Sequence, residues 1–161
     1  MPGDSWNDLL DQTRPVAAPP GPDKVTSLAP PGDDAALPAY GDPYKAAGTP
    51  DANPLTRLCC IMGREGFQPG GKAYRFFQYV HLDSDTDLGF TKDGQVITLR
   101  FAGASKMVEI KVFGRNLLRI CDDIHLHRMP WIRVADRDFK AADGVPDNKP
   151  VITEIRIEEV A

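Results

Sequence analysis

The chain has 161 residues, of which 42% are hydrophobic and 26% charged, and its formal net charge is −4 at pH 7. No apolar run approaches the roughly 20 residues that a membrane-spanning helix requires, and no basic N-terminal region precedes a hydrophobic stretch. Three cysteines, two of them adjacent at Cys59 and Cys60, do not make a disulfide framework. These features argue against a membrane protein and a disulfide-stapled secreted domain, and we expect a cytoplasmic protein.

Residues 1–54 differ sharply in composition from the rest of the chain. They hold eleven of the fifteen prolines, and three basic residues against eight aspartates give them a net charge of −5. Proline removes a backbone donor and disfavours helix in the residue before it, so we predict a disordered, acidic, proline-rich arm that adds few core contacts. Of the chain's 19 basic and 23 acidic residues, 16 and 15 remain in residues 55–161, a net charge of +1. These 107 residues are enough for one compact domain.

One short segment of the arm has the pattern of a helix. Ser5 can cap it, Asp8 follows at the capping-box position, and Trp6, Leu9 and Leu10 share one face. Such a segment can dock into a groove of a partner protein, with Trp6 as its anchor. The alternative is a transient turn, because isolated helices of this length are marginal in water.

The first half of the domain has the patterns of β-strands. Residues 57–62 are mostly apolar and residues 74–82 are rich in aromatic side chains, whereas 95–101 and 106–113 alternate between apolar and polar positions. Asp93-Gly94 and residues 102–105 provide turn residues before the two alternating segments. We therefore predict four strands here, with hairpin connections.

The pattern changes to a helical one after Gly114. Leu117, Ile120, Cys121 and Ile124 recur at helical spacing, which predicts a helix over residues 115–127, and Pro130 prevents its continuation. Two further strands are predicted, at residues 131–134 and 151–160. The order of elements predicts an α+β domain, with a mostly antiparallel sheet of about five strands and one helix late in the chain. The helix is expected to cover one face of the sheet, or to plug one end of a small curled barrel.

Two groups of residues imitate metal sites. Asp83, Asp85 and Asp87 resemble the start of a calcium loop, but Leu88 occupies the position of the required glycine and Gly94 that of the bidentate glutamate. We assign this segment to a solvated turn.

Cys121 and His125 are one helical turn apart and could supply two zinc ligands, with His127 and either Cys59 or Cys60 as further ligands. They are weak candidates, because the spacing matches no known zinc motif. Either Cys121 or Cys60 could also act as a nucleophile beside a histidine, but any chain with three cysteines and three histidines offers such pairs. We expect no cofactor and no metal.

A stretch of basic and aromatic residues spans residues 111–140. Within it, we expect a binding surface at the strand–helix corner and after the helix, formed by Arg115, Arg119, Trp131 and Arg133, because arginine and tryptophan dominate binding hot spots. The same stretch offers an alternative, in which basic and aromatic side chains hold single-stranded nucleic acid. Acidic residues interleave with the basic ones, and the net charge of +1 gives little long-range attraction to phosphates.

No catalytic pattern is present, and the sequence does not identify a function. We expect a non-enzymatic accessory or adaptor protein that binds a protein partner through the α+β domain, the arm or both. A small nucleic-acid-associated protein is the second hypothesis, and an enzyme of an unrecognised type is the third. Salt separates the first two hypotheses, because phosphate binding weakens steeply as the salt concentration rises.

Overall fold

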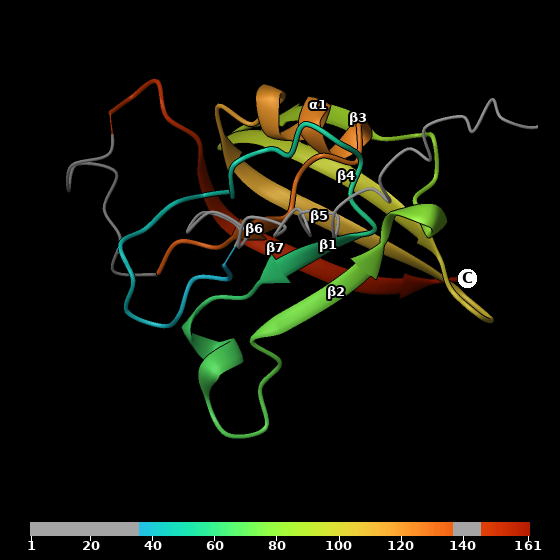
Figure 1. Ribbon diagram of the computed structural model, residues 1–161, viewed down its shortest axis with the longest axis horizontal. Coiled ribbons are helices and arrows are strands. Elements are labelled where there is room, and N and C mark those ends of the chain that lie inside the picture. The colour runs from blue at the N-terminus through green and yellow to red at the C-terminus, as the bar shows by residue number, and fades with distance from the viewer. Residues whose placement is uncertain (1–35, 137–145) are drawn as a thin grey trace, which may run out of the picture. The chain divides into compact units, whose positions relative to one another are not determined.

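The computed structural model describes residues 36–136 and 146–161, so Trp6 and the helix predicted around it lie outside the described residues. The described chain forms seven strands, one α-helix and two short 3-10 helices (Figure 1). In chain order these are β1 (Arg57–Ile61), η2 (Arg64–Phe67), β2 (Tyr74–Gln78), η3 (Tyr79–His81), β3 (Asp87–Thr91), β4 (Gly94–Ala102), β5 (Met107–Arg115), α1 (Leu118–His125), β6 (Trp131–Arg133) and β7 (Val151–Val160).

The larger sheet is antiparallel and has the strand order β3-β4-β5-β7. Alternation places one face of each strand in the core, as the sequence predicts: Ile97, Leu99 and Phe101 of β4 are buried, as are Ile110 and Val112 of β5. The expected alternation of β4 and β5 is confirmed.

The smaller sheet has the order β2-β1-β6, with β1 antiparallel to β2 and parallel to β6. The prediction of about five strands in a single sheet is therefore wrong, since seven strands form two sheets in the described part of the chain. The strand that was not predicted from the sequence is β3, whose Asp87 and Gly89 do not favour a strand. Asp93-Gly94 does close a hairpin, but between β3 and β4.

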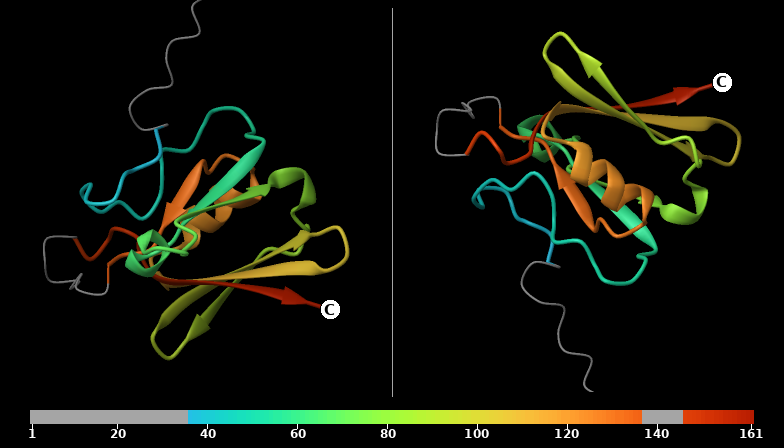
Figure 2. Two further views of the ribbon diagram at one scale, coloured as in Figure 1. Left: turned by 90° about the horizontal axis from the view of Figure 1, so that it is seen from below. Right: turned by 90° about the horizontal axis from the view of Figure 1, so that it is seen from above.

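The two sheets form two layers, with α1 between them at one side (Figure 2). One core cluster joins both sheets and the helix: it contains Leu58 and Ile132 from the smaller sheet, Leu99 and Ile110 from the larger sheet, and Ile124 from α1. None of the helices in the described residues is long and apolar enough to span a membrane.

Helix α1 is shorter at both ends than the predicted span of residues 115–127. Arg115 still belongs to β5, and Asn116 has a left-handed backbone with φ 56°, so the helix begins at Leu118. At the other end, His127 also takes a left-handed conformation, with φ 57°, and its ring stacks on Tyr79 at a centroid distance of 4.8 Å. Left-handed residues terminate helices, so backbone conformation fixes both ends here.

Residues 36–48 pack against the domain, and we call them the strap. Ala46 is buried, its carbonyl oxygen accepts a hydrogen bond from the Arg133 N–H at 2.8 Å, and the Gly48 N–H donates to the Trp131 carbonyl at 3.0 Å. The strap thus lies along the free edge of β6. Part of the segment predicted to be a proline-rich arm therefore pairs with an edge strand, a position that tolerates proline.

The Tyr44 hydroxyl connects the strap to both sheets. It lies 3.3 and 3.4 Å from the carbonyl oxygens of Arg133 and Ile152, either of which can accept its single proton, and it accepts a hydrogen bond from the Ile152 N–H at 2.8 Å. Burial raises the pKa of Tyr44 to about 12. The hydroxyl therefore stays protonated and can donate throughout the physiological range.

Candidate recognition site

Two of the predicted binding residues are interior. Trp131 and Arg133 on β6 are only 3% and 8% exposed. The Arg133 guanidinium donates to the carbonyl oxygens of Asp42 and Pro43 at 3.3 and 3.4 Å, so it holds the strap. Both side chains are therefore packed in the interior and contribute little exposed surface for binding.

The other predicted residues do not join them in one exposed surface. Arg115 ends β5 and pairs with Asp147 at 3.3 Å, whereas Arg119 is exposed on α1. The backbone at the start of this corner is tightly packed, because a Cβ at Gly114 would collide with the Val151 carbonyl oxygen. The fifth predicted residue, Trp6, lies outside the described residues.

Acidic neighbours neutralise several cations near the basic stretch. Lys111 Nζ lies 2.8 Å from Glu109 Oε1, and Arg100 Nε lies 3.2 Å from Glu109 Oε2. The hydrogen bonds from Lys111 and then Arg100 lower the pKa of Glu109. Arg156, on the neighbouring strand β7, pairs with Glu154 at 2.7 Å. These pairs reduce the charge available to a phosphate backbone.

The weak metal candidates lie in different environments. Cys121 is buried on the inner side of α1, whereas His125 is exposed. Within residues 36–136 and 146–161, no group of three or more histidine, cysteine, aspartate or glutamate side chains is arranged to hold a metal ion. Asp83 Oδ1 instead accepts a hydrogen bond from the Asp85 N–H at 3.3 Å, which fits the expected turn.

The three thiols are buried, and burial raises each thiol pKa. The pKa of Cys59 rises to about 11, although the nearby Arg57 opposes the shift. The pKa of Cys60 is raised by burial and by Cys59, and that of Cys121 by burial and by Asp122. Raised pKa values suppress the thiolate, which is the reactive form.

We therefore expect all three thiols to react with iodoacetamide at pH 8 more slowly in the folded protein than in denaturant, with Cys59 slowed about a hundredfold. The measurement is the rate of alkylation at each cysteine, followed by mass spectrometry. One thiol that reacts as fast in the folded protein as in denaturant would contradict this expectation and revive the cysteine-nucleophile hypothesis.

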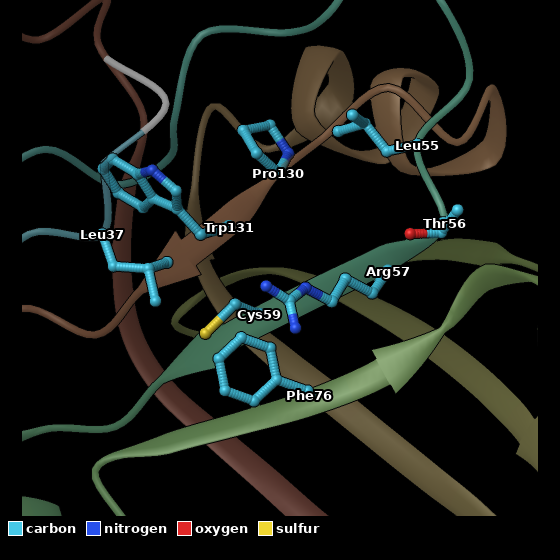
Figure 3. A pocket seen from close by; sticks show the side chains of 8 residues that line it. All are labelled: Leu37, Leu55, Thr56, Arg57, Cys59, Phe76, Pro130 and Trp131. Carbon is cyan, nitrogen blue, oxygen red and sulfur yellow. The ribbon is translucent and has the colours of Figure 1, made fainter. Parts of the chain in front are cut away.

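A hollow of about 180 Å³ lies on the outer face of the smaller sheet (Figure 3). Phe76 lies on one side of it, Trp131 and Pro130 lie on the other, and the Arg57 side chain crosses above the Phe76 ring. Its lining residues are Leu37, Leu55, Thr56, Arg57, Cys59, Phe76, Pro130 and Trp131. Most of this lining is apolar or aromatic.

Strand register explains why these side chains share one face. Cys59 on β1 is the partner of both Phe76 on β2 and Trp131 on β6, so the three residues form a row across the sheet. Neighbouring residues such as Leu58 and Ile132 face the opposite way, into the main core. The outer face of the sheet therefore carries its own set of apolar side chains.

Arg57 and Phe76 form the exposed part of this face. The Arg57 Cζ lies 4.6 Å from the centroid of the Phe76 ring, and Phe76 is 47% exposed. Among the described residues, no carboxylate lies within ion-pair distance of Arg57. The aromatic segment around Phe76 is evident in the sequence, but the sequence pattern does not indicate which of its side chains face solvent.

A second, larger cavity of about 880 Å³ lies between the η2 region and the start of β7. Its lining combines basic side chains, among them Lys72 and Arg75, with acidic ones such as Asp136 and Glu154. This mixture of charges favours neither sign of ligand, so it does not indicate a ligand class.

Comparison of the chain with protein-family models, with curated protein sequences and with solved structures gave no match.

Proposed function

We propose that the domain is a non-enzymatic protein-binding module of an accessory or adaptor protein, and that its recognition surface is the outer face of β1 and β2 around Arg57 and Phe76. The observation that carries the proposal is the half-exposed Phe76 ring beneath the Arg57 guanidinium, beside an apolar hollow. Arginine and aromatic side chains next to a pocket are typical of binding hot spots.

The packing of the face supports this proposal. Cys59 and Trp131 form a buried floor, whose positions are fixed by the strand register, whereas Phe76 and Arg57 rise from it towards solvent. A rigid apolar floor lowers the entropy lost when a partner binds. The raised thiol pKa values support a binding role for this face over nucleophilic catalysis by Cys59.

The test is an affinity purification in which the full-length protein captures partners from the cells that naturally produce it. We expect Phe76→Ala to weaken capture of a specific protein by about 30-fold, the effect of losing one strong hot spot. Phe90→Ala is the matched control, because Phe90 is 79% exposed but lies on β3 in the other sheet. Both variants should keep the melting temperature of the parent protein.

Nuclease treatment and a salt series separate this proposal from nucleic-acid binding. Capture of a protein through an apolar patch should survive nuclease and fall only modestly with salt. Equal capture by the Phe76→Ala variant and the parent would contradict the proposed surface. Loss of capture on Trp6→Ala instead would move recognition into the arm.

A further inference from the structure

Arg57 differs from Arg156, another of the arginines that lie over an aromatic ring. Arg156 lies over Phe113, with its Cζ 4.8 Å from the ring centroid, but its guanidinium also pairs with the Glu154 carboxylate at 2.7 and 3.0 Å. Arg57 has the same kind of ring contact, and no carboxylate of the described residues pairs with it. Its charge is therefore not neutralised by any carboxylate of residues 36–136 and 146–161.

Apart from its contact with the Phe76 ring, the Arg57 guanidinium forms no hydrogen bond or ion pair with the other described residues. A guanidinium above a ring uses its flat face for the cation–π contact, so its N–H groups point outward in the plane. A carboxylate can accept two parallel hydrogen bonds from such an edge, and these charge-assisted hydrogen bonds are stronger than neutral ones. The Phe76 ring thus positions Arg57 for a carboxylate.

The apolar hollow lies directly beside this cation. Its walls include Leu37, Leu55, Pro130 and the Trp131 ring, and the buried Cys59 lies among them. Burial of one apolar side chain in such a hollow removes apolar surface of both partners from water. The site therefore combines a place for an apolar group with a cation next to it.

We propose that this site recognises a peptide segment of a protein partner in which an aspartate or glutamate lies next to a large apolar residue. The carboxylate binds Arg57, and the apolar side chain enters the hollow between Phe76 and Trp131. This inference rests on the proposed function, to which it adds the chemistry of the partner.

The test uses synthetic decapeptides with acetylated and amidated ends, in which two adjacent central positions vary through every pair of amino acids in a glycine–serine background. Binding to the full-length protein is measured by fluorescence polarisation. We expect the tightest peptides to pair an acid with leucine, phenylalanine or tryptophan. Replacement of the acid by its amide should weaken them about tenfold, because a charge-assisted bidentate contact is lost.

Variants of the protein then test whether Arg57 is the residue that binds the acidic side chain of the peptide. Arg57→Gln should abolish the preference for the acid over the amide, and Arg57→Lys should keep only part of it, because lysine lacks the planar fork. Arg156→Gln is the matched control and should leave the preference unchanged. The side chain of Arg57 is exposed, so its variants should remain folded.

Several results would overturn the inference. These are a preference for basic or purely apolar pairs, an acid preference that survives Arg57→Gln, or a requirement for a free C-terminal carboxylate in place of an internal acid. Absence of binding by every peptide would also overturn it. None of these removes the proposed function if capture of a protein still depends on Phe76, so the two failures are distinguishable.

Discussion

A chain that begins at residue 54 is expected to unfold more easily than one that begins at residue 36, with a free energy of unfolding lower by at least about 3 kcal/mol. The shorter chain loses the buried Ala46, the two backbone hydrogen bonds along β6 and the hydroxyl contacts of Tyr44. Each hydrogen bond contributes about 1 kcal/mol, and burial of an aromatic side chain contributes about 1.5–3 kcal/mol. Urea denaturation of both chains gives the difference.

Point variants of the full chain separate the strap's contributions. Tyr44→Phe keeps the ring but removes the hydroxyl, so it should cost about 1–2 kcal/mol. Tyr40→Ala is a comparison within the strap, because Tyr40 is 55% exposed, and it should cost less than about 1 kcal/mol. Equal stability of the chains beginning at residues 36 and 54 would mean that the strap does not hold the domain together in solution.

Leu117→Ala and Ile124→Ala are each expected to lower the free energy of unfolding by about 2–5 kcal/mol. Both side chains are fully buried in the core cluster that joins α1 to the two sheets. Each truncation leaves a cavity that the surrounding strands cannot close without moving.

Arg119→Ala is the control for these two variants, because Arg119 lies on the exposed side of α1 and should cost less than about 1 kcal/mol. Chemical denaturation of the three variants under one set of conditions gives the comparison. Small and similar losses for all three would show that α1 does not pack on the sheets as the structure describes.

The parts of the fold that sequence analysis predicted are those in which burial leaves a periodic pattern. β4 and β5 each bury one face, so Ile97 and Ile110 fall on a period of two. β3 leaves no such pattern, because Leu88 is its one partly buried core contact and Gly89 interrupts it. The helix was predicted too long, because Asn116 and His127 take a left-handed backbone while they contact residues far away in the sequence: Asn116 Nδ2 donates to the Asp147 and Lys149 carbonyls, and His127 stacks on Tyr79.

The candidate site was the least predictable part. Tryptophan and arginine are common in binding hot spots, but Trp131 and Arg133 are buried, and Arg133 holds the strap. The proline content of the strap gave no indication that this segment packs on the domain. Arg57 and Phe76 meet because β1 and β2 pair in one particular register, and nothing local to either residue specifies that register. The pairing of β1 with β2 therefore determines which aromatic side chains are exposed to solvent.

The parallel pairing of β1 with β6 bears on the order in which the protein assembles. Cys59 meets Trp131 only after the chain has closed a loop of about seventy residues, whereas β4 and β5 join through a short turn. The hairpin of β4 and β5 is therefore expected to form early, and the sheet that carries Phe76 to be completed late. Local opening should run in the reverse direction, so amide protons of β6 should exchange with solvent before those of β4. A mild loss of stability would then open the smaller sheet and weaken partner binding at Phe76, while the larger sheet stays folded.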